Sequence, residues 1–253
     1  VGLMPIFELI SNTVSPIKLI DLSQPSQPLL KQLFIKAPGT SQHSMMVANL
    51  ADSAADAVGA DALLCKVSAY FHDIGKLEHP EYFTENQDGV NPHDLISATE
   101  STAIITSHTV DGVALAKKNK LPAAIIDIIS EHHGNSYPQY FYNKAVEEAK
   151  LKGLPAPNIK DFSYKGNIPQ TKESAIVMLA DTCEAAIKSM KITNSTDAEV
   201  QIRRLIKAKI DHDQLRDSHL SFEDIEKIIE AFTHVYAGLF HERISYQNEN
   251  KPK

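Results

Sequence analysis

Cysteine is nearly absent from this chain, which contains only Cys65 and Cys183 among its 253 residues. Both lie within apolar patterns of helical spacing. The sequence therefore excludes a disulfide framework and a metal site built from clustered thiolates. Such a composition predicts a reducing setting, which we expect to be the cytoplasm.

The chain also lacks long hydrophobic runs and a secretion signal. No apolar stretch approaches the roughly 18 residues that a membrane-spanning helix requires, and the N-terminus does not combine charged, apolar and cleavage regions. The first residue is nevertheless Val1 rather than methionine. We therefore expect a processed or excised piece, with any membrane attachment supplied by an N-terminal part of a longer parent at the cytoplasmic face of the cell membrane.

Basic residues are also fewer than acidic ones. The net charge is −7 and the pI is near 5.9, values that argue against a protein coating a nucleic acid polymer through a broad basic surface. A local basic pocket for a small phosphate ligand is compatible with this charge. No glycine-rich phosphate loop, internal repeat or low-complexity tract occurs.

What the chain does contain is a series of amphipathic helical patterns without a strand pattern, so the predicted fold class is all-α. We expect a helical extension over residues 1–36, a main domain over 37–247 and a disordered tail over 248–253. Thr40 or Ser41 is expected to begin a helix that ends near residue 58. Separate helices are expected over 99–108 and 111–119, and Gly75 is expected to end the helix over 61–71 in a left-handed conformation.

Several histidines and aspartates lie on inward helix faces or at expected helix ends. The alternative to a functional role is a hydrogen-bonded core histidine for each His and a surface carboxylate for Asp181. The adjacent pair His132 and His133 argues for a site, because each buried imidazole without a partner costs about 1–3 kcal/mol. These candidates are His43, His72, Asp73, His108, His132, His133 and Asp181.

The order of these residues resembles that of the HD-domain metallohydrolases. The resemblance extends beyond them, over nearly the whole chain from about Pro5 to Tyr246. It is specific to the cytoplasmic HD domain of the bacterial seven-transmembrane-receptor HD proteins, the PgpH-type cyclic di-AMP phosphodiesterases. The segments that carry it are APGTSQHS at 37–44, FHDIGK at 71–76, ENQ at 85–87, NPHD at 91–94, ISEHHG at 129–134, PQTKE at 169–173 and MLAD at 178–181.

This resemblance implies an all-helical HD fold with a dinuclear centre of divalent metal ions, most often iron or manganese. It implies that Asp73 bridges two ions. The first ion would be held by His43, His72, Asp73 and Asp181, and the second by Asp73, His108, His132 and His133. Ligands of imidazole and carboxylate type also suit zinc, cobalt or nickel, so the ligand types alone leave the metal open.

The implied reaction is hydrolysis of a cyclic dinucleotide, cyclic di-AMP, to linear pApA by a hydroxide that the two metals share. Asp73 and Lys76 are the candidate catalytic residues, with a solvated lysine as the alternative for Lys76. Weaker candidates for substrate contacts are Thr40, His93 and Ser107, and the loop aromatics Tyr82 and Phe83 are interpreted either as base-stacking groups or as loop anchors. Glu78 and His79 stand where the family leads us to expect basic residues.

Three other functions are compatible with these residues. One is an HD phosphohydrolase of nucleotides or of the alarmone ppGpp. A second is a di-iron oxygenase, because some HD proteins use the same cage for oxygen chemistry. A third is a non-catalytic cyclic-nucleotide sensor, which the complete ligand set disfavours. The sequence predicts no oligomeric state.

Overall fold

The structure is a computed structural model that describes residues 14–241. Within these residues the chain forms helices and no strand, which confirms the all-α prediction. The expected tail over 248–253 lies outside the described residues. The α-helices are α2 (Pro16–Leu22), α3 (Pro28–Lys36), α4 (Pro38–Val58), α5 (Ala62–Phe71), α6 (Ala98–Lys118), α7 (Ala123–Glu131), α8 (Gln139–Leu151), α9 (Lys172–Ser189), α10 (Ser195–Asp211) and α11 (Phe222–His241).

Short 3-10 helices fill the connections, including the loop after α5. They are η1 (Ile74–Leu77), η2 (Pro80–Tyr82), η3 (Thr84–Asn86), η4 (Pro92–Leu95) and η5 (Ile159–Phe162). No helix in the described part of the chain is long and apolar enough to cross a membrane.

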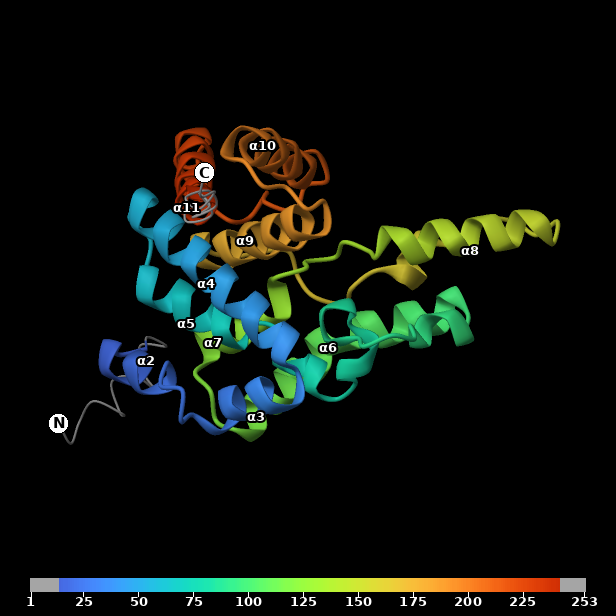
Figure 1. Ribbon diagram of the computed structural model, residues 1–253, viewed down its shortest axis with the longest axis horizontal. Coiled ribbons are helices and arrows are strands. Elements are labelled where there is room, and N and C mark those ends of the chain that lie inside the picture. The colour runs from blue at the N-terminus through green and yellow to red at the C-terminus, as the bar shows by residue number, and fades with distance from the viewer. Residues whose placement is uncertain (1–13, 242–253) are drawn as a thin grey trace, which may run out of the picture.

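The main core surrounds α4, which packs against α5, α9 and α11 (Figure 1). The buried face of α4 is built largely from small side chains, because Ala48, Ala51, Ala54 and Ala55 are all fully buried. Alanine allows neighbouring helices to approach closely at little cost in side-chain entropy. The larger residues that fill this core come mainly from α9, α10 and α11, among them Phe232, so α4 runs through the centre of the bundle.

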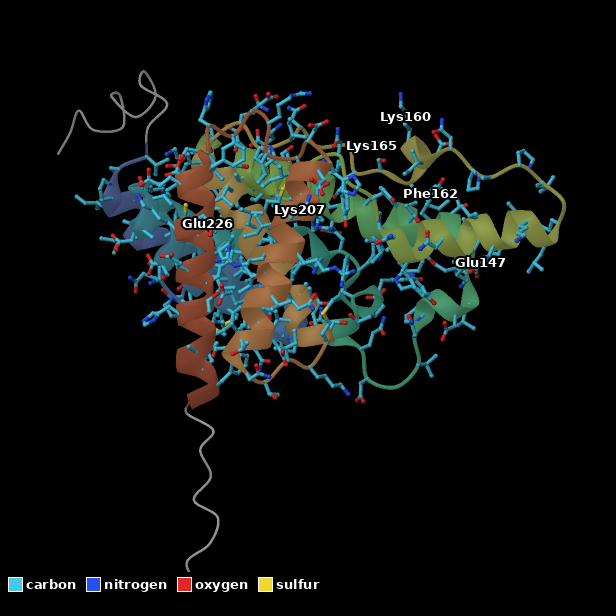
Figure 2. All side chains as sticks on the ribbon, turned by 90° about the horizontal axis from the view of Figure 1, so that it is seen from above. Glu147, Lys160, Phe162, Lys165, Lys207 and Glu226 are labelled. Atoms are coloured by element: carbon cyan, nitrogen blue, oxygen red, sulfur yellow. The ribbon has the colours of Figure 1, made fainter. Side chains whose placement is uncertain are left out.

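A second cluster joins α2 and α3 to the bundle. Leu19, Leu22 and Leu29 are buried together with Phe71 of α5 and Ile125 of α7. These contacts hold the end of α5 from one side. On the opposite side of the molecule α6 and α8 project away from the bundle (Figure 1), and Phe162 of η5 lies beside α8 (Figure 2).

The prediction that Gly75 adopts a left-handed conformation was wrong. Gly75 is absent from the described glycines with positive φ and lies within η1. It is needed because η1 crosses α6 closely: an added Cβ would lie 1.8 Å from the carbonyl oxygen of His108 and 2.5 Å from the backbone nitrogen of Gly112. Close approach of two backbones, rather than a left-handed turn, is therefore the role of this glycine.

Two helix boundaries also differ from expectation. The predicted break between 108 and 111 does not exist, because α6 runs continuously from Ala98 to Lys118. Gly112, within this helix, is the residue that packs against Gly75. The long helix α4 begins at Pro38 instead of after Thr40 or Ser41, with proline in its first turn, where the missing N–H costs nothing.

Candidate metal centre

Five helices bring the predicted ligands together. His43 comes from α4, His72 is the C-cap of α5 and Asp73 follows it, and His108 lies in the middle of α6. His132 and His133 follow α7, and Asp181 lies in α9. The donor atoms form two compact groups, each able to hold a metal ion: one of His43, His72 and Asp73, the other of His108, His132 and His133.

Asp73 lies between the two groups and is 1% exposed. Its Oδ2 atom faces the first group, at 3.5 Å from Nε2 of His43 and 3.2 Å from Nε2 of His72. Its Oδ1 atom faces the second, at 3.3 Å from Nε2 of His108 and 3.8 Å from Nε2 of His132. One carboxylate thus presents a different oxygen to each group, as a bridging ligand does.

Asp181 closes the arrangement from α9. Its Oδ1 atom lies 3.0 Å from Nε2 of His43 and 3.8 Å from Nε2 of His72, while its Oδ2 atom lies 3.5 Å from Nδ1 of His133. Asp181 is 6% exposed, so the surface-carboxylate alternative is wrong. A buried carboxylate with these neighbours is stable only beside positive charge.

Backbone carbonyls orient three of the imidazoles. The Nδ1 atoms of His72, His108 and His132 each bond the carbonyl oxygen three residues earlier, at 2.7, 2.6 and 2.8 Å respectively. A carbonyl only accepts, so each Nδ1 carries a proton, and in the neutral imidazole the lone pair is then on Nε2. This fixes the tautomer that a metal requires and aims it at Asp73.

Glu184 does the same for His43 and is a residue that the sequence analysis missed. It lies in α9 one turn after Asp181, is buried, and accepts a hydrogen bond from Nδ1 of His43. The Nε2 atom of His43 then faces Asp73 and Asp181. The signal in the sequence is the spacing of three residues between two acids on one helix face, which alone does not distinguish a buried Glu from an exposed one.

The carboxylates around the first group favour positive charge on its imidazoles. Burial opposes the charged form of His43, but hydrogen bonds to Asp181 and Glu184 outweigh it and raise the pKa of His43 to about 9. Burial likewise opposes the charge of His72, but the charges of Asp73 and Asp181 and hydrogen bonds to them raise its pKa to about 10. In the metal-free protein these protons supply the positive charge that the carboxylates demand.

The second group stays neutral. Burial, followed by the charges of His72 and His108, lowers the pKa of His132 to about 3. Burial and the neighbouring His132 lower the pKa of His133, and burial lowers that of His108. Neutral imidazoles are the form that binds metal ions, so this group loses no proton on binding.

The buried polar atoms fit a pair of metal ions. Nε2 of His72 and both carboxylate oxygens of Asp73 are buried, and among the described residues their close contacts are ion-pair contacts, such as that from Lys76 to Oδ2, rather than hydrogen bonds of good geometry. Buried unpaired polar atoms are costly and rare in folded proteins, and their concentration at one point indicates a ligand that satisfies them. The donor set, with imidazole nitrogens and carboxylate oxygens, is one that divalent transition metals accept.

Lys76 lies at the edge of the centre and is not a solvated lysine. Its ammonium group is 2.8 Å from Oδ2 of Asp73 and 2.8 Å from Oε1 of Glu85, and its side chain is only 12% exposed. It also lies 4.8 Å above the ring of Phe83. Phe83 is 5% exposed and its ring meets that of His108 edge-on, so it anchors the loop.

Thr40 belongs to the same loop anchor. It is fully buried, its hydroxyl donates to Glu85 at 3.0 Å, and its backbone N–H donates to Asn86 at 3.1 Å. The side chain of Asn86 in turn donates to Thr40 Oγ1 at 2.8 Å. These bonds hold η3 against the start of α4 and explain the position of Lys76, whereas they leave Thr40 little capacity for a substrate.

The structure does not bring His93 and Ser107 into the two groups. His93 is buried with its Nε2 atom 2.9 Å from the carbonyl oxygen of Tyr82. Ser107 donates to Asp111 at 2.7 Å, one turn further along α6. Both side chains therefore have local partners of their own.

Tyr164 is a second residue that the sequence analysis missed. It comes from the connection before α9, and its ring covers that of His133 at 4.3 Å with an angle of 32° between the planes. Burial raises the pKa of its hydroxyl. The charge of Lys76 opposes this rise, whereas the charges of Asp181 and Asp73 add to it. The phenol therefore stays protonated beside the centre.

Comparison with known proteins shows the family to which the chain belongs. The HD-domain family model matches residues 40–186. The cyclic-di-AMP phosphodiesterase PgpH of Bacillus subtilis is 41% identical over 252 residues, which are 99% of this chain and 35% of the relative. The protein of the same name from Listeria monocytogenes is 41% identical over 254 residues, covering 98% of this chain and 34% of the relative. The chain thus spans about a third of the length of these relatives.

A solved structure is similar over most of the chain. It is the crystal structure of the L. monocytogenes phosphodiesterase PgpH HD domain in complex with cyclic-di-AMP. The sequences are 42% identical, the TM-score is 0.81, and the match covers 87% of this chain and 100% of the other.

Proposed function

This chain belongs to the HD-domain family, and from that premise we propose that it is a metal-dependent phosphodiesterase that opens cyclic di-AMP to the linear dinucleotide pApA. The observation that carries the proposal is the pair of donor groups with Asp73 between them, since its Oδ2 atom faces His72 of the first group and its Oδ1 atom faces His108 of the second. Support for the substrate comes from the names of the relatives and from the ligand of the similar solved structure.

We assign the first metal ion to His43, His72, Asp73 and Asp181, and the second to Asp73, His108, His132 and His133. Iron or manganese is proposed for both, which the donor set accommodates and the family resemblance favours. Neither cysteine competes as a ligand, because Cys65 and Cys183 are buried in the main core and belong to neither group.

When bound, two such ions would lower the pKa of a water molecule towards neutrality and would polarise a phosphoryl oxygen. The protein supplies the rest. Asp73 and Asp181 each contact imidazoles of both donor groups. Lys76 is placed beside Asp73 to balance the negative charge that grows on the phosphate during attack, and the neutral phenol of Tyr164 is a hydrogen-bond donor at the same edge.

The remaining parts of the full-length protein stay a prediction. We expect attachment to the cytoplasmic face of the cell membrane through an N-terminal part of the parent. Within this chain the proposed partner is a small nucleotide rather than a nucleic acid polymer.

The test is a product assay on the purified chain, loaded anaerobically with Fe²⁺ or Mn²⁺. Cyclic di-AMP, cyclic di-GMP, ppGpp and nucleoside triphosphates are compared, and products are separated by chromatography. We expect pApA from cyclic di-AMP as the fastest reaction. Faster turnover of ppGpp or of triphosphates, oxygen consumption in place of hydrolysis, or binding of cyclic di-AMP without turnover would each contradict the proposal.

A further inference from the structure

An exposed apolar face lies on α2 and α3, which run next to each other along one edge of the molecule (Figure 1). Ile17 and Ile20 of α2 are 76% and 52% exposed, and Phe34 and Ile35 of α3 are 66% and 65% exposed. The opposite sides of both helices are buried in the second cluster. Large apolar side chains gathered on the surface in this way mark a site that another body covers.

The apolar face continues from α3 onto α4. A pocket of about 380 Å³ is lined by Leu30 and Phe34 of α3, Met45 of α4 and Tyr70 of α5. Met45 is itself 47% exposed. Lys31 belongs to the same pocket wall, so the apolar surface spans three helices and has a cation beside it.

The charge of this face is opposite in sign to that of the chain. Residues 14–45, which form α2, α3 and the start of α4, contain three lysines and one aspartate, whereas the whole chain has a net charge of −7. Lys18, Lys31 and Lys36 are exposed, and among the described residues only other lysines form ion pairs with carboxylates. The face therefore carries cations that are available to a partner.

On α3 the cation and the apolar side chains share one side of the helix. Lys31 precedes Phe34 by three residues and Ile35 by four, which are the spacings of neighbours on a helix surface. A lysine can lay its methylene stem on an apolar layer while its ammonium group reaches the polar boundary of that layer. A helix with aromatic and aliphatic side chains beside lysines is typical of those that lie in the boundary region of a lipid bilayer.

A second copy of the chain fits this face less well than a bilayer does. A symmetric contact brings the same patch of both subunits together, so it would set the lysines of one copy against those of the other. Interfaces between proteins are also depleted in lysine and enriched in arginine, whereas residues 14–45 contain three lysines and no arginine. An anionic bilayer supplies phosphate groups for the lysines and an apolar layer for the exposed side chains.

We infer that α2 and α3 dock on the surface of an anionic lipid bilayer. Phe34 and Ile35 enter its boundary layer, and Lys18, Lys31 and Lys36 contact lipid phosphates. The described helices make this contact themselves, and it does not depend on the proposed reaction. Because α3 also packs on η1 beside the metal centre, docking would hold that centre near the membrane.

The test measures co-sedimentation of the full chain, loaded with Mn²⁺ and freed of excess metal, with lipid vesicles. Vesicles of equal parts phosphatidylglycerol and phosphatidylcholine are compared with vesicles of phosphatidylcholine alone. We expect binding to the anionic vesicles only, and weaker binding at high salt because salt screens the lysines. Phe34→Ser/Ile35→Ser should lower the partition coefficient by on the order of tenfold, and Lys18→Gln/Lys31→Gln/Lys36→Gln should lower it by on the order of 100-fold.

The matched controls carry the same changes on other surfaces. Phe222→Ser/Val200→Ser alters side chains that are 85% and 58% exposed, and Lys150→Gln/Lys152→Gln/Lys160→Gln removes three exposed charges. Both controls should bind as the wild type does, and circular dichroism should show the wild-type helical signal for every variant. Variants of the face that bind as well as their controls would overturn the inference, as would a wild-type chain that binds neither kind of vesicle or both equally.

Two further measurements distinguish other occupants of the face. Light scattering without lipid detects a dimer, and a dimer that Phe34→Ser/Ile35→Ser abolishes would assign the face to a second copy and overturn the lipid contact. Deletion of residues 1–13 tests the chain's own N-terminal segment. If the full chain does not bind anionic vesicles and the shortened chain does, the face belongs to that segment and the inference fails.

Discussion

Replacing Gly75 by alanine tests the crossing that holds Asp73 against His108. The added Cβ would lie 1.8 Å from the carbonyl oxygen of His108, whereas real Cβ atoms essentially never approach closer than 3.0 Å. The backbones of η1 and α6 must therefore separate by about 1.2 Å. The obstacle is backbone, which cannot rotate away as a side chain can.

The cost follows from overpacking. Extra methyl groups in a packed interior cost about 1–3 kcal/mol, and a clash with two backbone atoms belongs at the upper end, about 3 kcal/mol. For a chain of this size each kcal/mol lowers Tm by about 2–4 °C. Gly75→Ala should therefore lower Tm by about 6–12 °C, and by moving Asp73 away from His108 it should also reduce the bound metal.

Thermal unfolding followed by circular dichroism measures the first effect, in chelator so that metal binding does not contribute. The matched control is Gly238→Ala in α11, where nothing lies within 4 Å of the added Cβ. Alanine there should stabilise the helix by about 0.5–1 kcal/mol. A Tm for Gly75→Ala equal to that of the wild type would refute the close crossing.

Two further predictions concern the support of the centre and the response to acid. Glu184→Gln should weaken binding of the ion assigned to His43 by about 10–100-fold, because the partner that orients the imidazole loses its charge; chelator competition measures this, with the exposed Glu147→Gln on α8 (Figure 2) as control, and equal affinities would contradict it. Hydrogen bonds from Lys172 and the backbone N–H of Ser221 lower the pKa of Asp224 to about 2, so its charge stabilises the fold above the unfolded pKa of about 3.9 and that contribution is lost as pH falls towards 2. Asp224→Asn should therefore lower the urea midpoint at pH 7, the gap to the wild type should narrow between pH 4 and pH 2, and a gap independent of pH would exclude this role.

The sequence predicted the helical fold and the convergence of seven side chains because both leave local signals. His132 and His133 interrupt an apolar face in a way that ordinary cores avoid, and the motif around Asp73 resembles that of a known family. The structure places these residues together. Their role as metal ligands stays a prediction.

What the sequence could not reveal depends on contacts between distant segments. The sequence predicted a left-handed turn at Gly75, whereas glycine is required there because η1 crosses the backbone of α6 at His108 and Gly112. Glu184 reads as one more polar position on a helix, and only the approach of α4 to α9 makes it a partner of His43. Tyr164 lies in a connection without periodicity, so no pattern could place its ring over His133.

The central claim is that Asp73 bridges two metal ions held by these helices. Elemental analysis of the wild-type protein and of Asp73→Ala, both purified from metal-replete medium, tests it most directly. We predict two ions in each wild-type chain and almost none in the variant, with the helical circular dichroism unchanged. A correctly folded Asp73→Ala protein that retains the full wild-type metal content would contradict the account.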